Sequence, residues 1–597
     1  MAFGVWDLSH LYKTNDEFLK DFAYLEKCLK NLKKFKGKLC KNNPDDILAY
    51  FQQESEFSLI LDRLAVYAFC KQDDDGKNDE NVKNYGLISD FCSKVGEELA
   101  FSKTELASHD ETFLKTLMKD KKFADFDRVI EDIIRFKKHT LSEKEEQNLA
   151  VLSSFSNTSD IFSVLSNIEM DHGSFVDEDG KTVKLFPGNY NTHMNAPSAE
   201  KRKLVNETYL AEYGKLNQTF SNLFTSHIKY QNYLAKTYGF KSVLDRKTYA
   251  EEVSPEIMMV NIKNVKKYIN LLQEYFALKK ELLKLSEFRS SDIGVSLFTD
   301  KFEKISYEQA VADIKESFKV LGDDYVSKFD EAVNNGWIDA FPRETKKSGG
   351  YTISAYDVHP YILLNFDGTM DWASAIAHEF GHAMHSFYSA QNQPYSKSDY
   401  TLFVAEVVSL TNEILYSHYL IEKTTDKHMK MKLIADFLQL FELNVFDSSM
   451  LAEFELFAHD KLQAGETLTA PDYNNKFVEL SKEYFGNITF NKGYEFNWSR
   501  KGHIYRDYYL YKYSLGMCCA CLISKRLLED KTGEYLKKYK QFLCLGGSKD
   551  PVSSLLVADV DVLSNEIYDG AFKVFEEYLN ELKELSSISG QDNTDAL

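Results

Sequence analysis

The feature that most restricts the fold of this 597-residue chain is its helical periodicity. Apolar residues recur at three- and four-residue spacing over most of its length, for example in residues 16–34, 256–285 and 431–446. Only nine prolines occur. Because proline interrupts a helix interior, this scarcity permits long helices, and the chain is predicted to be mainly α-helical.

Two stretches break the helical pattern. Residues 173–190, GSFVDEDGKTVKLFPGNY, contain two short alternating runs around Asp179-Gly180, which predicts a β-hairpin. Residues 348–369, SGGYTISAYDVHPYILLNFDGT, are β-prone and are punctuated by Gly349-Gly350 and Pro360. They predict one or two strands of a small sheet.

The length of the chain exceeds what one hydrophobic core usually serves, so two or more subdomains are expected. Asn195-Ala-Pro-Ser198 provides a helix start after the predicted hairpin, and we place a boundary near residue 195. The predicted division is an N-terminal helical region, 1–195, a main domain, 196–585, and a polar tail, 586–597, that we expect to be disordered.

Charge and composition narrow the class of partner and the compartment. A formal net charge of −20 argues against a nucleic-acid partner. Met1 to Lys20 shows no secretory signal, and the longest apolar run near the C-terminus, residues 515–523, is too short to span a bilayer. The eight cysteines are scattered, and the C-C-A-C cluster lacks metal spacing. A cytoplasmic protein without a membrane partner is expected.

Residues 378–382, His-Glu-Phe-Gly-His, form an H-E-x-x-H pattern, which is typical of zinc metalloproteases. Residues four apart lie on one helix face, so His378 and His382 can bind one ion. Glu379 would flank that ion, where it can take a proton from water. So short a pattern also occurs by chance in helices that bind no metal.

A catalytic zinc needs a third protein ligand and an open position for water. His385 follows His378 by seven residues, which rise about 10.5 Å along a helix, too far for one ion with bonds of about 2.1 Å. The longer H-E-x-x-H-x-x-G-x-x-H pattern is absent, since positions 385 and 388 are His and Tyr. We expect His385 to be a core residue or to lie behind the ligands.

Two glutamates interrupt an apolar helical stretch, residues 402–420. Glu406 and Glu413 are two helical turns apart and share one face, where two carboxylates are costly unless a cation pairs with them. Glu406 follows His382 by 24 residues, enough for a loop and a returning helix. We predict Glu406 as the third ligand and Glu413 as a carboxylate that orients a ligand histidine. The alternative is a solvated acidic face.

A tyrosine-rich stretch, SRKGHIYRDYYLYKYSLG, occupies residues 499–516. An aromatic stripe of this kind is usually packing. His503, Tyr508 and Tyr511 could also donate hydrogen bonds to the oxyanion that develops when an amide is hydrolysed.

With these motifs in place, the chain resembles the oligoendopeptidase F group of the thimet oligopeptidase-like family of HExxH zinc peptidases. The resemblance covers most of the chain. It includes the motifs Val5-Trp6-Asp7-Leu8, Gly188-Asn189-Tyr190, His359-Pro-Tyr-Ile-Leu-Leu-Asn-Phe366, HEFGHAMHSFYS, Phe403-Val-Ala-Glu-Val407 with Asn412-Glu413, and the His503 segment.

The resemblance implies that His378, His382 and Glu406 bind one Zn²⁺ per chain and that Glu379 is the general base. It also implies a two-lobed, mainly helical zincin, with a deep substrate channel and a small β-sheet near the active site. Such a channel admits short oligopeptides, and an edge strand within residues 349–366 could pair with an extended peptide.

The resemblance further implies that His503 and Tyr511 contact substrate and the oxyanion. The spacing between His503 and the tyrosines differs from that of the thimet branch, so Tyr505 and Tyr508 are less closely matched. We therefore predict a cytoplasmic zinc endopeptidase, its main domain carrying catalysis. The alternatives are a zinc carboxypeptidase of similar helical fold and a catalytically silent peptide-binding protein.

Overall fold

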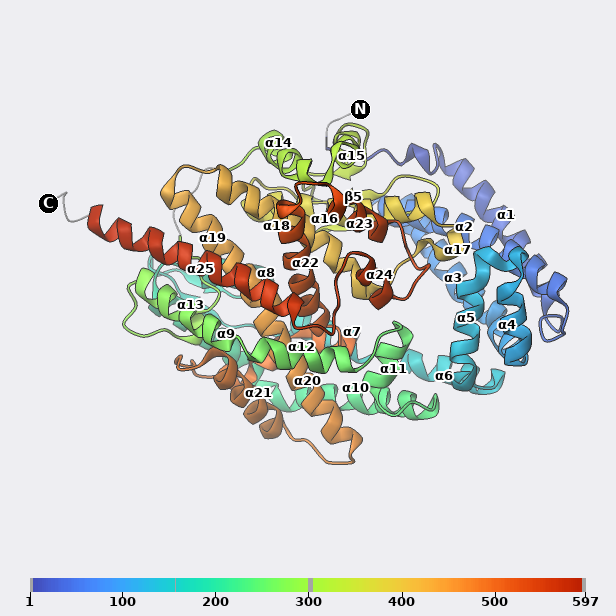
Figure 1. Ribbon diagram of the computed structural model, residues 1–597. Coiled ribbons are helices and arrows are strands. Elements are labelled where there is room, and N and C mark those ends of the chain that lie inside the picture. Colours follow the sequence, from blue (N-terminus) through green and yellow to red (C-terminus); the bar gives the residue numbers. More distant parts are fainter. Residues whose placement is uncertain (1–3, 156, 299–303, 593–597) are drawn as a thin grey trace. The chain divides into compact units, whose positions relative to one another are not determined.

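The computed structural model describes residues 4–155, 157–298 and 304–592, and most of them lie in helices (Figure 1). They divide into two compact units. Unit 1 takes its described residues from Met1–Leu149, Glu303–Tyr419 and Ile523–Val560, and unit 2 from Ala150–Phe302, Leu420–Leu522 and Asp561–Leu597. Each unit therefore combines three separate stretches of chain, and the boundary near residue 195 stays a prediction.

Unit 1 contains an N-terminal group of helices and the helices that carry the H-E-x-x-H pattern. Its helices are α1 (Asn15–Leu32), α2 (Pro44–Asp74), α3 (Asp79–Ala107), α4 (Glu111–Lys119), α5 (Asp127–Phe136), α14 (Tyr307–Ser317), α15 (Asp323–Asn334), α16 (Met370–Asn392), α17 (Tyr395–Ser398), α23 (Glu534–Leu543) and α24 (Pro551–Val557). The chain passes between the units within α6 (Glu143–Phe155), α18 (Leu402–Lys423) and α22 (Tyr511–Glu529).

Unit 2 is built from the remaining helices and a hairpin. Its helices are α7 (Thr158–Val164), α8 (Pro187–Met194), α9 (Ala199–Lys215), α10 (Asn217–Thr237), α11 (Val243–Ala250), α12 (Glu256–Lys266), α13 (Ile269–Leu282), α19 (Lys427–Phe441), α20 (Ser448–Gln463), α21 (Ala470–Phe485) and α25 (Glu566–Asp592). The predicted hairpin is confirmed: β1 (Ser174–Val176) pairs antiparallel with β2 (Thr182–Lys184), and Ser198 caps the start of α9.

A three-stranded sheet lies in unit 1, in the order β3-β5-β4. The predicted strands of the 348–369 stretch are β4 (Tyr351–Ile353) and β5 (Tyr361–Leu363), which pair antiparallel with Thr352 opposite Ile362. The third strand, β3 (Ile338–Asp339), is parallel to β5. Since β5 is central and fully buried, β4 is an edge strand of this sheet.

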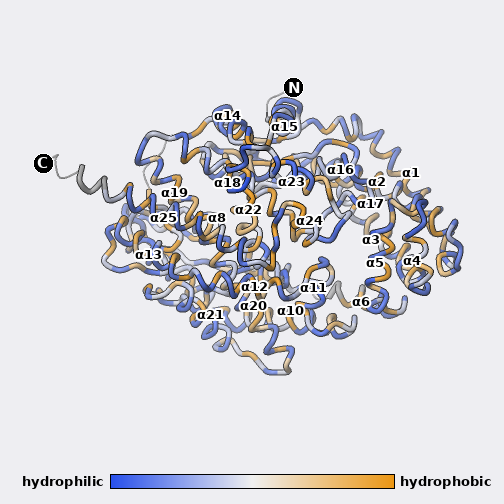
Figure 2. The backbone as a smooth tube through the Cα atoms, in the orientation of Figure 1, coloured by the Kyte–Doolittle hydropathy of each residue, from blue (hydrophilic) through white to orange (hydrophobic). Residues whose placement is uncertain are grey.

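Hydrophobic and hydrophilic residues alternate along most helices, as Figure 2 shows. Such alternation is expected of amphipathic helices that bury one face.

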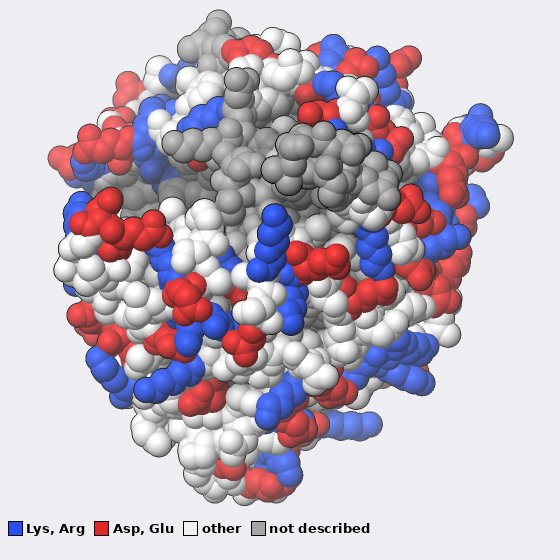
Figure 3. Space-filling model, turned by 90° about the vertical axis from the view of Figure 1, so that its left-hand side faces the viewer, with Lys and Arg blue, Asp and Glu red and all other residues white. Residues whose placement is uncertain are grey.

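On the face drawn in Figure 3, acidic and basic side chains are interspersed among the described residues. No helix among the described residues is both long and apolar enough to cross a bilayer. All eight cysteines are free thiols, and Cys518, Cys519 and Cys521 are buried in α22.

Two expectations about helices are wrong. Residues 256–285 form two helices, α12 and α13, rather than one. The break occurs at Tyr268, whose ring stacks on Phe572 of α25 with centroids 4.1 Å apart. The polar tail expected to be disordered from residue 586 is helical as far as Asp592, because α25 continues to that residue. Residues 593–597 lie outside the described residues.

Candidate metal centre

Two helices of unit 1, α16 and α18, carry the predicted ligands. Thr369 begins α16 by accepting a hydrogen bond from the backbone N–H of Trp372, so the loop ending in Asp367-Gly368-Thr369 leads directly into this helix. The two helices lie close together at Gly381. A Cβ added there would lie 2.6 Å from Ser409 Cα, so the glycine inside the H-E-x-x-H pattern permits this contact.

The structure brings His378, His382 and Glu406 together. Glu406 Oε2 lies 3.5 Å from His378 Nε2 and 3.8 Å from His382 Nε2. One potential ligand atom from each of the three residues lies within 4.8 Å of the other two. Their side chains are 19–23% exposed, so the cluster is reached by solvent. A carboxylate and two imidazoles thus face one point from two helices.

Glu413 lies behind this cluster. Its Oε2 is 3.1 Å from His378 Nδ1, and its Oε1 accepts a hydrogen bond from Ser374 Oγ at 2.9 Å. When the Nδ1–H of His378 donates a hydrogen bond to Glu413, the other ring nitrogen, Nε2, keeps a free lone pair on the side of Glu406. Asn412 anchors the same helix by donating to the Ala377 carbonyl at 3.1 Å.

Glu379 is held beside the cluster by the edge strand. Thr352 Oγ1, on β4, is 2.9 Å from Glu379 Oε2 and 2.8 Å from the Glu379 carbonyl oxygen. The other carboxylate oxygen, Oε1, forms no side-chain hydrogen bond with a described residue. The side chain is nearly buried, at 9% exposure. Glu379 therefore has one fixed oxygen and one available oxygen.

Burial and the neighbouring charges shift the pKa values of His378, His382 and Glu379. Burial by itself would lower the pKa of His378, but the hydrogen bond and charge of Glu413, with the charges of Glu379 and Glu406, raise it to about 9. Burial, together with the positive charge of His378, lowers the pKa of His382 well below its usual value. Burial raises the pKa of Glu379. One imidazole of the pair therefore carries a proton that a bound cation would displace.

His385 is not one of the residues that converge in this cluster. Its ring stacks on Tyr400, with ring centroids 3.6 Å apart, and lies beside the ring of Phe542, with ring centroids 5.4 Å apart. It is only 1% exposed, and burial lowers its pKa to about 3. Tyr400 in turn places its hydroxyl 3.0 Å from Ser386 Oγ. His385 is thus a neutral side chain packed in the core of unit 1.

The tyrosine-rich segment belongs to unit 2. His503 is exposed and stacks on Tyr509 with ring centroids 6.3 Å apart. Tyr511 is 1% exposed, and its hydroxyl has no hydrogen-bond partner among the described residues. Tyr508 is buried with its ring against His459, and Tyr505 packs on Phe162. The roles of these residues in catalysis stay predictions.

The chemistry of the donors in unit 1 fits a divalent transition-metal ion. Two imidazole nitrogens and one carboxylate oxygen form a donor set that suits zinc. Orientation of His378 by Glu413 is the arrangement that metal-binding histidines usually have. The ligand atoms are 3.5 and 3.8 Å apart, slightly more than the roughly 3.4 Å edge of a tetrahedron with 2.1 Å bonds. A small inward movement of Glu406 would close the difference.

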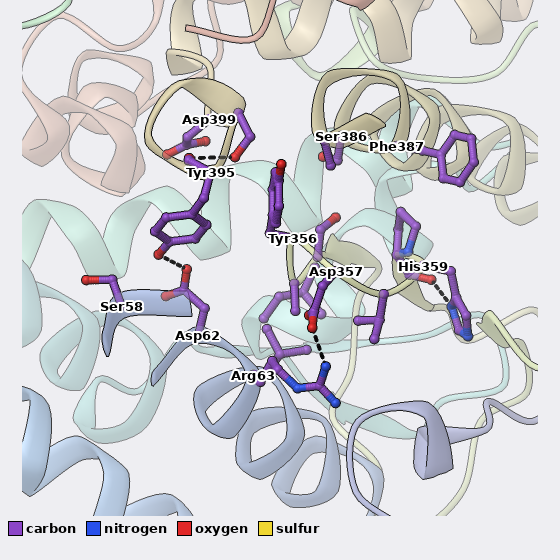
Figure 4. A pocket seen from close by; sticks show the side chains of 18 of the residues that line it. Ser58, Asp62, Arg63, Tyr356, Asp357, His359, Ser386, Phe387, Tyr395 and Asp399 are labelled. Carbon is purple, nitrogen blue, oxygen red and sulfur yellow. Dashed lines mark hydrogen bonds and ion pairs between the residues drawn. The ribbon is translucent and has the colours of Figure 1, made fainter. Parts of the chain in front are cut away.

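A cavity of about 1460 Å³ lies in unit 1. It is lined by the β4–β5 connection, by the C-terminal half of α16, and by α2 and α17. Figure 4 shows Tyr395 directed at Asp62, with its hydroxyl 2.5 Å from Oδ2, and Arg63 paired with Asp357. None of the three predicted ligands lines it, but β4 and α16 border both the cavity and the cluster.

Two contributors to the site were missed from the sequence, Thr352 and Ser374. Ser374 precedes His378 by one helical turn, so its position on the same face was available from spacing. Thr352 is in a strand 27 residues before Glu379, and no local pattern relates the two.

Comparisons with known proteins identify the family of the chain. Residues 192–574 match the family described as Peptidase family M3, and residues 105–171 match the family described as Oligopeptidase F. The chain is 32% identical over 590 residues to Oligopeptidase PepF of Bacillus subtilis, covering 98% of this chain and 87% of the relative. It is 28% identical to the Oligoendopeptidase F homolog of Lactococcus lactis, covering 97% of each chain.

Solved structures are similar to this chain in fold over nearly its whole length. A protein of Chlamydophila abortus is 28% identical with a TM-score of 0.89, and the match covers 98% of both chains. Oligoendopeptidase-F from Enterococcus faecium is 24% identical with a TM-score of 0.74, covering 96% of this chain and 99% of that one.

Proposed function

The chain belongs to peptidase family M3 and is a peptidase, and from this premise we propose that it is a zinc-dependent metalloendopeptidase that cleaves short oligopeptides. One observation supports the proposal most: His378, His382 and Glu406 converge, with Glu379 fixed beside them by Thr352. The alternative of a catalytically silent peptide-binding protein is not retained.

In this proposal His378, His382 and Glu406 hold one Zn²⁺ per chain, and Glu413 orients His378. The ion, when bound, polarises the scissile carbonyl and makes water more acidic. The proposed reaction requires one divalent ion at this centre. Zinc is the proposed ion because the centre offers two imidazole nitrogens and one carboxylate oxygen as donors.

Glu379 is the proposed general base. Thr352 Oγ1 donates to Oε2, which leaves Oε1 to accept a proton from the attacking water. The same carboxyl then delivers this proton to the nitrogen of the leaving amine, so that Glu379 returns to its starting state. Burial raises the pKa of Glu379, which makes it a stronger base and eases the first transfer.

His503 and Tyr511 are proposed to donate hydrogen bonds to the oxyanion that forms from the scissile carbonyl. The support for Tyr511 is a buried hydroxyl with no partner among the described residues. Tyr508, whose ring packs on His459, is proposed as a further donor.

The substrate is proposed to be an extended peptide that pairs with the free edge of β4, the strand that carries Thr352. Pairing through the backbone would place a peptide bond close to Glu379 and leave side-chain preference broad. The cavity that follows β4 offers room for substrate side chains. The free thiols support a reducing compartment such as the cytoplasm.

The variant Glu379→Gln tests the mechanism. We expect turnover of an internally quenched peptide to fall by at least about 100-fold, while zinc content measured by elemental analysis stays at the wild-type value. The matched control is Glu344→Gln, whose side chain is 87% exposed and whose activity should not change. Turnover by Glu379→Gln near the wild-type rate would refute the role of this residue.

A peptide blocked at both ends distinguishes the endopeptidase from a zinc carboxypeptidase. Internal cleavage of the blocked peptide, detected by mass spectrometry, is the expected result. Cleavage that requires a free C-terminal carboxylate would instead favour the carboxypeptidase.

A further inference from the structure

A second cluster of metal-ligating side chains lies entirely within unit 2. Glu455 and His459 are one turn apart on α20, and Asp507 follows the short helix Gly502–Arg506. One potential ligand atom from each of the three residues lies within 4.8 Å of the other two. His459 Nε2 is 3.7 Å from Asp507 Oδ1 and 3.9 Å from Glu455 Oε1.

These side chains are almost completely removed from water. Glu455 is 0% exposed, and His459 and Asp507 are 1% exposed. Glu455 Oε2 and both ring nitrogens of His459 have no hydrogen-bond partner among the described residues. Buried polar atoms without partners are destabilising, so an imidazole and a carboxylate that converge here indicate a missing partner.

The remaining neighbours support a positively charged partner. Asp507 Oδ1 is 2.9 Å from His227 Nε2, whose other nitrogen lies 2.9 Å from Thr158 Oγ1, and Oδ2 is 3.0 Å from Lys247 Nζ. Lys247, 35% exposed, pairs with Asp507, and Arg246 and Lys512 add positive charge nearby, but none of these cations forms a hydrogen bond with Glu455 Oε2. Burial raises the pKa of Glu455 well above its usual value, but a protonated Oε2 would still lack an acceptor.

The imidazole is suited to donate an electron pair. Burial lowers the pKa of His459 to about 4, so the ring is neutral near pH 7 and has a free lone pair. The backbone around the cluster is held in an uncommon conformation, with φ of 37° at Asp507 and 59° at Tyr508. The Tyr508 N–H donates to Glu455 Oε1, which leaves Oε2 for another partner.

We propose that Glu455, His459 and Asp507 form a second, structural site for a divalent transition-metal ion, distinct from the centre of unit 1. The bound ion joins α20 to the segment that begins at Asp507, with His227 orienting Asp507 from behind. One nitrogen and two carboxylate oxygens suit zinc or a similar ion, and a cluster without solvent access is typical of structural rather than catalytic sites.

Counting ions tests this proposal without any measurement of activity. The full chain and the variant His378→Ala/His382→Ala are prepared with Zn²⁺, dialysed against metal-free buffer and analysed for zinc per chain. We expect two ions in the wild type and one in the double variant. Adding Glu455→Gln to the double variant should remove the remaining ion, while adding Glu479→Gln, 67% exposed, should not.

A titration of the double variant with Co²⁺ keeps the test valid if Glu455→Gln does not fold. Because cluster residues are then unchanged, one equivalent of Co²⁺ should produce visible absorption bands and raise the thermal unfolding temperature. No ion in the double variant, together with no response to Co²⁺, would overturn the proposal and indicate a hydrogen-bonded cluster only. The outcome does not depend on the proposed peptidase mechanism, since both histidine ligands of unit 1 are absent from this variant and only Glu406 remains there.

Discussion

The two candidate metal clusters are alike in construction and differ in their access to solvent. Each joins two residues four apart on one helix, His378 and His382 or Glu455 and His459, to a carboxylate from elsewhere. Nitrogen–oxygen separations are 3.5 and 3.8 Å in unit 1 and 3.7 and 3.9 Å in unit 2. The first cluster is 19–23% exposed, and the second 0–1%.

This difference indicates which chemistry each cluster can perform. In the proposed function, an ion in unit 1 would keep a position open for water, with Glu379 beside it as the base. An ion in unit 2 would be held by side chains that are only 0–1% exposed. The same helical spacing can therefore produce a catalytic or a structural site, and the surrounding packing decides which.

The largest expected effect concerns loss of a ligand from the exposed cluster. His382→Ala should reduce peptide turnover by at least about 10³-fold, since a metal acting as a Lewis acid supplies several kcal/mol. The counterpart in the buried cluster, His459→Gln, should retain turnover well above that of His382→Ala. Equal losses in a quenched-peptide assay would break the distinction between catalytic and structural sites.

Removal of metal by a chromogenic chelator should separate the two clusters by rate. The exposed ion is expected to leave in a fast phase together with activity. The buried ion should leave in a slow phase, because its release needs local unfolding of unit 2, and low concentrations of urea should accelerate it. A single phase that releases all the metal with activity would contradict the comparison.

The orienting carboxylate of the exposed cluster provides a smaller effect. Glu413→Gln weakens the hold on His378 Nδ1 and should lower zinc affinity by about 10- to 100-fold, as measured by competition with a chelator. Ser374→Ala, which removes only the hydrogen bond to Glu413 Oε1, should lower affinity less. An affinity for Glu413→Gln equal to the wild type would exclude an orienting role.

The smallest effect is expected from the helix contact that supports the exposed cluster. Gly381→Ala introduces a Cβ 2.6 Å from Ser409 Cα, so α16 and α18 must separate. We expect a loss of about 1–3 kcal/mol, seen as a lower thermal unfolding temperature. The control is Gly86→Ala in α3, where an added Cβ meets nothing within 4 Å, and which should be neutral or slightly stabilising.

Much of the fold could be predicted because its causes are local. Helical periodicity predicted α1, α16 and α18, and turn residues at Asp179-Gly180 predicted the hairpin. The split between α12 and α13 was not predicted. At the break Tyr268 stacks on Phe572, more than 300 residues away in the chain, and local spacing says nothing of such a contact. Strand β3, with only two residues, was missed for lack of any detectable pattern.

The exposed cluster could be predicted from the sequence because its residues occupy two short stretches with distinct composition. Glu406 and Glu413 were conspicuous as the acidic residues of an apolar helix. In the buried cluster, Glu455 and His459 share helical spacing as well, but Asp507 lies 48 residues later in an irregular turn. Nothing in the local pattern relates that aspartate to α20.

By itself, the sequence determined the helices, the hairpin and which side chains share a helix face, because these depend on spacing and on steric preferences of neighbouring residues. Only the tertiary structure decided which faces meet. The approach of α16 to α18 at Gly381, the hydrogen bond from Thr352 to Glu379, and the enclosure of His459 each depend on contacts between distant stretches. Convergence and burial, which distinguish an open centre from a closed one, are properties of packing rather than of spacing.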